Sequence, residues 1–501
     1  MTLSHDALLE RLAARHAGPH PEGAFAGVTA DDRAVDAIHD LFVAIRGARH
    51  DSHSSLEALA RAGKIRGAVG EQPRPAELAV PYYRVENSRR ALAELAWAFA
   101  GDPGRQLRLF GITGTNGKSS TVRLLAAILE AAGRDVGWLG TVTRRTGSGE
   151  VASSLTTPEP LELARGLREL LDAGGTDAVL EVSSHALEQQ RVAGLAFSGA
   201  IFTNLSRDHL DYHRDAQAYL QAKLQLFERV APGCPAVIPL AGPVSATDPQ
   251  LRNLQVCTFG ESAEADAYPE QLELDQRGMR GVLRVRGQRI PLQTQLLGRH
   301  NLANILAAAL LASSVGVPSD AIAAALSSAP AVRGRLERVP VPRGEVFVDY
   351  AHTPDALEAV LGAVREITNG RLMVLFGCGG DRDRGKRPQM GEVAARLADR
   401  VFVTSDNPRG EEPATIVADV VAGMSGAQKT HVEVDRRQAI ATALDELHAD
   451  DVLVVAGKGH ETEQLVAGKR LPFDDRRVIE EHAQSSSDPT ASATQGKGLT
   501  V

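Results

Sequence analysis

The chain has 501 residues, of which 43% are hydrophobic and 24% are charged, a composition typical of globular proteins. This length suggests about three domains, and the composition excludes a chain that is disordered throughout. A net charge of -8 and an aromatic content of 4% argue against a nucleic-acid partner.

In chain order, the first two blocks of the sequence differ in pattern. Residues 1–101 contain a short apolar run at 40–45 and a helical pattern over 88–99, and they end in a turn-rich segment. In residues 105–332, strands are predicted at 106–112, 177–182 and 200–205, and helices at 119–132, 161–173 and 216–230. Strands that alternate with helices predict a parallel sheet covered on both faces. The segment 254–297 is β-rich instead, and an alanine-rich helix is predicted over 301–314.

The third block, residues 333–482, returns to alternating strands and helices. Its apolar strands are predicted at 346–348, 372–376, 401–404 and 452–456. Residues 483–501 are rich in Ser, Thr, Gly and Gln, which predicts a disordered tail. The chain is therefore predicted to be an α/β protein of three domains.

The cysteines and the N-terminal residues indicate the cellular compartment of the protein. Cys234, Cys257 and Cys378 lie far apart and form no C-x-x-C pair, as is typical of a reducing compartment. Charged residues interrupt the first 20 positions, and no uncharged apolar run reaches the ~18 residues of a spanning helix. We therefore expect a cytoplasmic protein that does not insert into a membrane.

The segment 113–120, Thr-Gly-Thr-Asn-Gly-Lys-Ser-Ser, has the context of a phosphate-binding loop, between a predicted strand and a predicted helix. Glycines let the backbone close round an anion, and the helix N-terminus directs free N–H groups at it. Lys118 offers a positive charge to a γ-phosphate, and Ser119 offers a hydroxyl to Mg²⁺. Ile112 occupies the first glycine position of the usual pattern. The alternative is a glycine-rich turn at a helix start that is followed by Lys-Ser by chance. This alternative is disfavoured because a strand, a turn, a lysine, a hydroxyl and a helix occur together in order. The loop alone does not distinguish a GTPase, a kinase, a motor ATPase and a ligase.

Polar residues follow two further predicted strands, in Glu181-Val-Ser-Ser-His185 and in the segment 203–209. The carboxyl ends of parallel strands meet at the edge of the sheet where ligands bind. Mg²⁺ prefers oxygen ligands, so Glu181 is a natural partner of Ser119. His209 is less typical of a magnesium site and, standing alone, would indicate only a histidine hydrogen-bonded near a strand end.

These motifs occur in order with four others, at residues 219–223, 298–304, 334–337 and 349–354. The set extends over about residues 106–475 and resembles the ATP-dependent Mur ligases of peptidoglycan synthesis. Within that family it most resembles the enzymes that add the third peptide residue. The resemblance implies an N-terminal α/β domain for a UDP-sugar, a central ATPase domain with a parallel sheet and a phosphate loop, and a C-terminal Rossmann-like domain.

The resemblance also implies roles for individual residues. Lys118, His209 and Lys223 would be catalytic, and Ser119, Glu181 and His209 would bind Mg²⁺. Lys223 matches a lysine that the family carbamylates, which would make it a carboxylate ligand for a second Mg²⁺; alone it would be a solvated helix lysine. ATP would contact Gly114, Thr115, Asn116, Gly117, Lys118, Ser119, Ser120, Asn304, Arg335 and Asp349. The UDP-muramoyl dipeptide would contact Asp32, Thr156, Thr157, Ser183, Gln189 and Arg191.

The incoming amino acid is expected to bind in the third block. The segment 406–409, Asp-Asn-Pro-Arg, matches the motif of enzymes that add meso-diaminopimelate. Arg409 offers a planar guanidinium to the distal carboxylate of diaminopimelate, a group that the substrate L-lysine does not have. The alternatives are a strand-ending turn, and L-ornithine or L-lysine as substrate, because Glu461 could bind any distal ammonium. The implied amino-acid site is Arg382, Asp406, Asn407, Pro408, Arg409, Gly457 and Glu461.

The N-terminal block departs from the family pattern. Asp32 stands where members usually have serine, close to an anionic pyrophosphate, and its charge is unfavourable there unless Arg33 or Arg49 offsets the repulsion. The alternative that the chain is a related ligase with a different carboxylate substrate, such as a folate-type substrate, therefore stays open. A scaffold without ligase activity is disfavoured because the catalytic residues are intact, and a GTPase because Asn304 and Arg335 match an adenine site. We expect a monomer whose partners are small molecules: ATP, a UDP-sugar dipeptide and a diamino acid.

Overall fold

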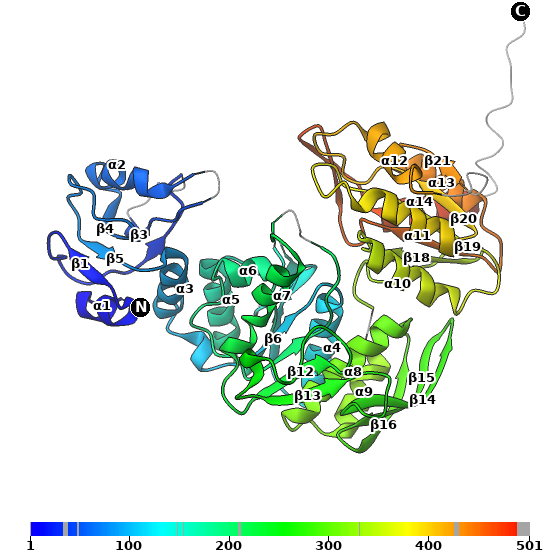
Figure 1. Cartoon of the computed structure of the whole chain (residues 1–501), viewed down its shortest axis with the longest axis horizontal. Coiled ribbons are helices and arrows are strands. Elements are labelled where there is room, and N and C mark those ends of the chain that lie inside the picture. The colour runs from blue at the N-terminus through cyan, green and yellow to red at the C-terminus, as the bar shows by residue number, and fades with distance from the viewer. Residues whose placement is uncertain are drawn as a thin grey trace, which may run out of the picture.

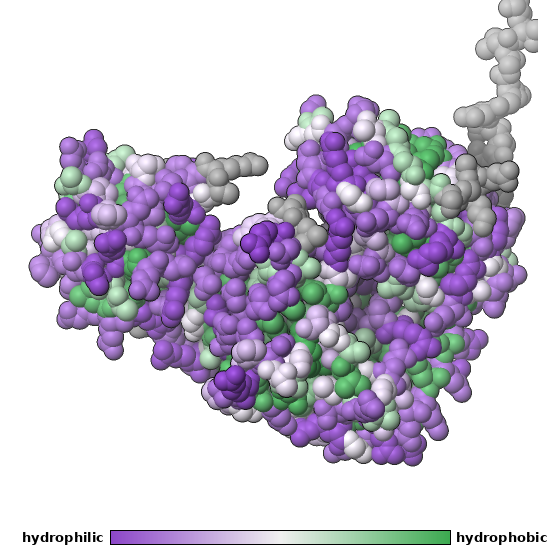
Figure 2. Space-filling view, viewed as in Figure 1, coloured by the Kyte–Doolittle hydropathy of each residue, from purple (hydrophilic) through white to green (hydrophobic). Residues whose placement is uncertain are grey.

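A computed structural model describes residues 2–33, 39–47, 50–147, 149–153, 155–208, 212–329, 331–424 and 430–487. They form three α/β domains (Figure 1), with the N-terminal domain joined to the central one through α3 (Ser88–Phe99) and the C-terminal domain lying against the central domain. Figure 2 shows a mostly hydrophilic surface, with hydrophobic residues gathered over the central domain and a hollow between it and the C-terminal domain. The predicted α/β class is confirmed.

The N-terminal domain is built on a five-stranded sheet, which is parallel except at its β1 edge. One face is covered by α1 (His5–Leu12) and α3, which bury Leu8, Leu95 and Tyr83, and the other by α2 (Leu56–Arg61). In order, the strands are β1 (Arg15–Ala17), β5 (Tyr82–Arg84), β4 (Ile65–Gly70), β3 (His39–Val43) and β2 (Val28–Thr29).

The central sheet has eleven strands and is parallel only in its middle. The parallel strands, in order, are β13 (Gln255–Phe259), β12 (Pro235–Pro239), β11 (Gly199–Phe202), β6 (Arg108–Thr113), β10 (Asp177–Glu181) and β7 (Val136–Leu139). On one side the sheet is extended by antiparallel pairing of β8 (Thr143–Arg145) and β9 (Glu150–Ala152). On the other side β14 (Ala267–Asp275) pairs parallel to β13, and β15 (Gly278–Val285) and β16 (Gln288–Thr294) follow it in antiparallel order. The parallel sheet predicted for this block is therefore extended at one edge by strands of the β-rich segment 254–297, and at the other by β8 and β9.

Two groups of helices cover the central sheet. The core on one face includes residues of α4 (Lys118–Ala131), α8 (Arg299–Ser314) and α9 (Ser319–Ser328). The core on the other face includes residues of α5 (Pro160–Asp172), α6 (Ser184–Glu188) and α7 (Ala216–Leu224). The helix predicted to reach residue 230 ends at Leu224 and is followed by a short 3₁₀ turn, Phe227–Arg229. Because α4 starts where β6 ends, its N-terminus lies at the carboxyl edge of the sheet.

The C-terminal domain has a six-stranded sheet, parallel except for its edge strand β17. The strands, in order, are β17 (Glu337–Val339), β18 (Glu345–Asp349), β22 (Val452–Ala456), β19 (Leu372–Phe376), β20 (Arg400–Val403) and β21 (Thr430–Val432). One face packs on α10 (Pro354–Arg365), α11 (Lys386–Leu397) and α12 (Pro413–Val421), and the other on α13 (Arg436–Asp445) and α14 (Asp475–Ser487). A separate hairpin, β23 (Glu463–Val466) and β24 (Lys469–Pro472), was not predicted.

The end of α14 corrects the predicted tail. Disorder was expected from residue 483, whereas the helix continues to Ser487. Buried Val478 and Ile479 anchor it, and Glu481 accepts hydrogen bonds at 2.8 Å from both Arg437 and Arg477. Residues 488–501 lie outside the described residues. Among the described helices, none combines the length and apolar character needed to cross a membrane.

Candidate active site

The phosphate-binding loop lies between β6 and α4. Gly114 and Gly117 have φ of 140° and 83°, and a Cβ at either would collide with the side chain of Thr203 or Asn304, respectively. The segment after β11 holds the loop from outside: Thr203 Oγ1 and Asn204 Nδ2 donate to the carbonyl of Asn116 at 2.6 and 3.0 Å. The glycines therefore let the loop pack against Thr203 and Asn304 at the N-terminus of α4, where free backbone N–H groups can bind the phosphates of ATP.

Two lysine amines converge on this loop. Lys118 Nζ donates to the carbonyls of Gly114 and Thr115 at 3.1 and 2.8 Å. Lys223, on α7, donates to the same Gly114 carbonyl at 2.7 Å and lies 4.1 Å from the ring centroid of Tyr219. Burial, followed by the charge of Lys118, lowers the pKa of Lys223 well below its usual range, which favours the neutral amine. Burial also lowers the pKa of Lys118, although Glu181 opposes the effect.

Glu181 supplies the carboxylate of the predicted metal site. It ends β10, is 1% exposed, and accepts hydrogen bonds from the backbone N–H and hydroxyl of Thr141 at 2.9 and 2.8 Å. Ser119 and Glu181 line one cavity of about 810 Å³. Their oxygens are the donors that Mg²⁺ prefers, so this pair fits a magnesium ion. His209, the third predicted ligand, lies outside the described residues.

A second cavity, of about 530 Å³, lies between the central and C-terminal domains. Asn304 comes from α8, and its Oδ1 accepts a hydrogen bond from Thr121 Oγ1 at 3.2 Å. The Asp349 carboxylate accepts from the backbone N–H groups of Leu336 and Ala351, both at 2.7 Å. Burial raises the pKa of Asp349, although Arg335 opposes the effect. Of the predicted ATP residues, the structure brings Asn116, Gly117, Ser119, Ser120, Asn304, Arg335 and Asp349 to this cavity.

Most of the predicted dipeptide residues form one network beside Glu181. Thr157 Oγ1 donates to the Glu181 carbonyl at 2.9 Å and accepts from the N–H of Ser183 at 3.1 Å. Arg191 donates to the Thr157 carbonyl at 2.7 Å and to Gln189 Oε1 at 2.8 Å. Thr156 joins through a hydroxyl contact of 3.1 Å with Thr141. These side chains are therefore positioned next to the phosphate loop.

Asp32 lies apart, in a cavity of about 690 Å³ that includes N-terminal residues and the start of α5. The Arg33 side chain is 89% exposed and pairs with Asp31 rather than with Asp32. Instead, Asp32 accepts hydrogen bonds from Ser55 at 2.7 Å and interacts with His50 at 2.8 Å. The Ser55 hydrogen bond, then His50, lowers the pKa of Asp32. Arg49 lies outside the described residues.

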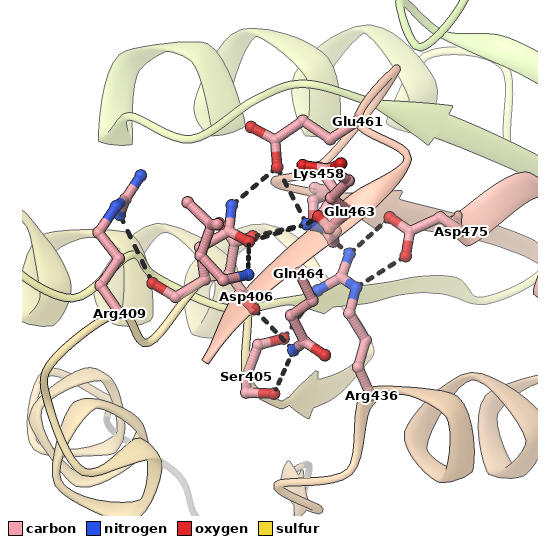
Figure 3. Close-up of polar contacts among 12 residues, drawn as sticks. Ser405, Asp406, Arg409, Arg436, Lys458, Glu461, Glu463, Gln464 and Asp475 are labelled. Carbon is pink, nitrogen blue, oxygen red and sulfur yellow. Dashed lines mark hydrogen bonds and ion pairs between the residues drawn. The ribbon is translucent and has the colours of Figure 1, made fainter. Parts of the chain in front are cut away.

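The predicted amino-acid residues lie on three loops of the C-terminal sheet, which follow β19, β20 and β22. Figure 3 shows Asp406, Arg409 and Glu461 among them. Asn407, after β20, donates to Glu461 Oε2 at 2.7 Å. Lys458, after β22, is fully buried, and its amine donates to Glu461 Oε2 at 2.9 Å and to Asn407 Oδ1 at 3.2 Å. Lys458 was missed from the sequence, although its place in Gly-Lys-Gly-His-Glu was a usable signal. The amine fixes two side chains of the predicted site relative to each other.

Two arginines of the same site have cationic groups available to a ligand. Arg409 donates to the Gly380 carbonyl at 2.9 Å, and Arg382 to the Asp381 carbonyl at 3.3 Å. Within the part of the chain that the structure describes, neither forms an ion pair with a carboxylate. The backbone N–H of Arg409 donates to the carbonyl of Leu465 at 2.9 Å, so hairpin β23–β24 fixes this loop. A carboxylate of a ligand could therefore pair with Arg409.

The cavity of about 810 Å³ brings the two halves of the site together. Its lining includes Ser119 and Glu181 from the central domain, and Asn407, Arg409 and Glu461 from the C-terminal domain. His460, a further residue missed from the sequence, also lines it, and burial followed by the charge of Arg335 lowers its pKa to about 4. A molecule bound by Arg409 and Glu461 would thus face the phosphate loop.

A buried ion pair supports these loops from below. Arg436 Nε and Nη2 donate to both oxygens of Asp475 at 2.7 Å, both side chains are fully buried, and Nη2 also donates to the Ala456 carbonyl at 2.9 Å (Figure 3).

We expect Asp475→Ala to lower the free energy of unfolding by about 3–5 kcal/mol, because it leaves a buried guanidinium unpaired. Chemical denaturation measures this. Asp445→Ala, on exposed α13 surface, is the control and should change it by less than about 0.5 kcal/mol; equal effects would contradict the prediction.

Comparisons with known proteins show which family the chain resembles. Residues 112–312 match the Mur ligase middle domain, and residues 334–459 match the Mur ligase glutamate ligase domain. A UDP-N-acetylmuramoyl-L-alanyl-D-glutamate--2,6-diaminopimelate ligase of Gloeobacter violaceus is 43% identical over 92% of this chain and 94% of its own length. An enzyme of the same name from Chlorobaculum tepidum is 40% identical over 95% of both chains.

Solved structures give a similar result. A UDP-N-acetylmuramoyl-L-alanyl-D-glutamate--2,6-diaminopimelate ligase superposes with a TM-score of 0.67 at 30% identity, covering 97% of this chain and 99% of its own. Mycobacterium tuberculosis folylpolyglutamate synthase superposes with a TM-score of 0.59 at 19% identity, covering 74% of this chain and 92% of its own, and shares the fold.

Proposed function

Because this chain belongs to the Mur ligase family, and is thus an ATP-dependent ligase, we propose that it joins meso-diaminopimelate to UDP-N-acetylmuramoyl-L-alanyl-D-glutamate in peptidoglycan precursor synthesis. The observation that carries the proposal is the shared cavity, in which Ser119 and Glu181 face Arg409 and Glu461. An acceptor activated at the phosphate loop and a diamino acid held by the C-terminal domain would meet there.

The first chemical step joins two anions. A carboxylate oxygen of the acceptor attacks the γ-phosphorus of ATP, the bond to the leaving ADP oxygen breaks, and an acyl phosphate forms. Lys118 of the phosphate loop and Arg191 of the network beside Glu181 are cations that would offset the repulsion. When bound by Ser119 and Glu181, Mg²⁺ would add positive charge at the phosphates.

In the second step, the amine of the diamino acid attacks the acyl carbon. A tetrahedral intermediate forms, phosphate leaves with the bonding electrons, and the nitrogen gives up a proton. Asn407, Arg409 and Glu461, which line the shared cavity, would orient the amino acid for this attack. Arg382, Asp406, Pro408 and Gly457 complete the proposed amino-acid site. Such positioning converts a bimolecular reaction into an effectively unimolecular one.

The surroundings of Lys223 favour its carbamylation. Carbamylation needs a neutral amine, and the buried position of Lys223 beside Lys118 lowers its pKa in that direction. Reaction with CO₂ would form an N–C bond and release a proton, giving a carboxylate close to Gly114. Together with His209, this carboxylate would complete the magnesium ligands that the family resemblance implies.

The acceptor is proposed from the extent of the similarity. The 43% identical ligase aligns over 92% of this chain, and the solved ligase over 97%, so the likeness is not confined to the ATPase domain. His50 and Ser55 stabilise the unusual Asp32 without closing its cavity. We also infer that the protein is cytoplasmic, because ATP and UDP-linked precursors are cytoplasmic; that it is a monomer stays a prediction.

The specificity of Arg409 tests the proposed substrate. Wild-type protein should ligate meso-diaminopimelate faster than L-lysine or L-ornithine, since only diaminopimelate offers a distal carboxylate to the guanidinium. We expect Arg409→Ala to lower kcat/KM for diaminopimelate by about 10²-fold, as for loss of a charged hydrogen bond. Lysine should be affected much less. Steady-state phosphate release measures both, with Arg384→Ala, an exposed arginine, as control. Faster turnover of lysine by the wild type would remove Arg409 as a specificity determinant.

A further inference from the structure

Three histidines gather on the N-terminal domain, away from the residues assigned to ATP and the diamino acid. His5 begins α1, His16 lies on β1, and His20 follows in the next turn. One ring nitrogen of each lies within 4.8 Å of the others. The ring centroids are 4.6 Å apart for His5 and His16, 5.3 Å for His5 and His20, and 5.0 Å for His16 and His20.

One ring nitrogen of His5 and one of His16 already have partners. His16 Nε2 lies 3.1 Å from the carbonyl of Pro19, which can only accept, so in the neutral tautomer that makes this hydrogen bond Nδ1 carries the lone pair. His5 Nδ1 lies 2.9 Å from the hydroxyl of Tyr83, which leaves Nε2 for another ligand. A hydrogen bond from the second ring nitrogen is what orients most metal-binding histidines.

The backbone under the cluster is fixed. His16 is paired directly with Tyr83 in the antiparallel β1–β5 ladder, and Tyr83 is fully buried. Ser4 caps α1 by accepting from the N–H of Ala7, which sets the position of His5. Two of the three imidazoles therefore extend from regular, hydrogen-bonded elements, whereas His20 is exposed and can adjust.

We propose that His5, His16 and His20 form a binding site for Zn²⁺ or a chemically similar divalent transition ion. Three imidazole nitrogens and a water molecule give the tetrahedral set that zinc accepts, with nitrogens about 3.3 Å apart. The cluster reaches this spacing by movements of about 1.5 Å or less, within the range of side-chain rotation. The bound ion would tie α1, β1 and the following turn to one another and stabilise the N-terminal domain.

Zinc binding to the full-length, metal-stripped protein tests the site. The protein is dialysed against Zn²⁺ without ATP or Mg²⁺, and bound zinc is counted by atomic emission. We expect wild type to bind one more Zn²⁺ than His20→Ala, which separates this site from zinc held at Glu181. His448→Ala, which alters an exposed histidine of the C-terminal domain, should bind as wild type does. Tyr83→Phe should weaken this Zn²⁺ about 10-fold, because it removes the partner of His5.

Two further readouts keep the outcome clear. Zn²⁺ should raise the melting temperature of wild type more than that of His20→Ala. Co²⁺ should give a tetrahedral absorption band in wild type and in His448→Ala, and this band should be absent in His20→Ala. His20→Ala should keep ligase activity, which shows that it folds. Equal zinc content and affinity in wild type and His20→Ala would overturn the proposal, whatever the ligase activity.

Discussion

Lys118→Ala is expected to lower the rate of ligation by at least about 10²–10³-fold, because it removes the cation of the phosphate loop. The amine rests on the carbonyls of Gly114 and Thr115, within reach of a phosphate bound in the cradle. Both anions of the first step approach this point, so the loss should appear in kcat rather than only in KM for ATP. Phosphate release at saturating substrates measures it.

Two controls accompany this variant. Lys64→Ala removes an exposed lysine of the N-terminal domain and should leave the rate unchanged. The melting temperature of Lys118→Ala shows whether the buried position still folds. A folded Lys118→Ala protein with activity within about tenfold of wild type would mean that this lysine does not offset charge at the γ-phosphate.

Lys223→Ala is expected to lower ligation by about 10²-fold or more, because it removes the carbamate that would hold a second Mg²⁺. The wild-type enzyme should also lose activity when CO₂ and bicarbonate are stripped, and regain it when they return. The lowered pKa of Lys223 keeps more of the amine neutral at neutral pH than an exposed lysine would have, so carbamylation should persist there. Initial rates in degassed and bicarbonate-supplemented buffer measure this.

Chemical rescue distinguishes a lost carboxylate from a damaged fold. Formate is small enough to enter the space left by the Lys223 side chain, and it should restore part of the activity of Lys223→Ala. It should not restore Lys118→Ala, in which the missing group is a cation. Unchanged wild-type activity without CO₂, together with no rescue by formate, would contradict carbamylation.

The sequence predicted best what is local. The helix over 88–99 has the predicted bounds, and the phosphate loop lies between a strand and a helix as expected. Glu181 at the end of β10 shares a cavity with the phosphate loop because β6 and β10 are parallel strands of the central sheet. The residues after β20 and β22 lie together because these strands run parallel in the C-terminal sheet. This rule made the candidate site predictable from segments far apart in the chain.

Non-local contacts were not predictable in the same way. Asp32 is stabilised by His50 and Ser55, 18 and 23 positions away, whereas the sequence pointed to the adjacent arginine. Lys458 fixes Asn407 and Glu461 only because two loops of one sheet meet. The antiparallel strands at both edges of the central sheet also depend on pairing partners that hydrophobic periodicity does not specify.

The transfer of a labelled oxygen tests the proposed reaction most directly. UDP-N-acetylmuramoyl-L-alanyl-D-glutamate with ¹⁸O in its side-chain carboxylate is incubated with ATP, Mg²⁺, meso-diaminopimelate and the enzyme, and the products are analysed by mass spectrometry. An acyl phosphate predicts one tripeptide per phosphate released, with one ¹⁸O in each phosphate. Phosphate without label, or phosphate release without tripeptide, would contradict the proposed ligase.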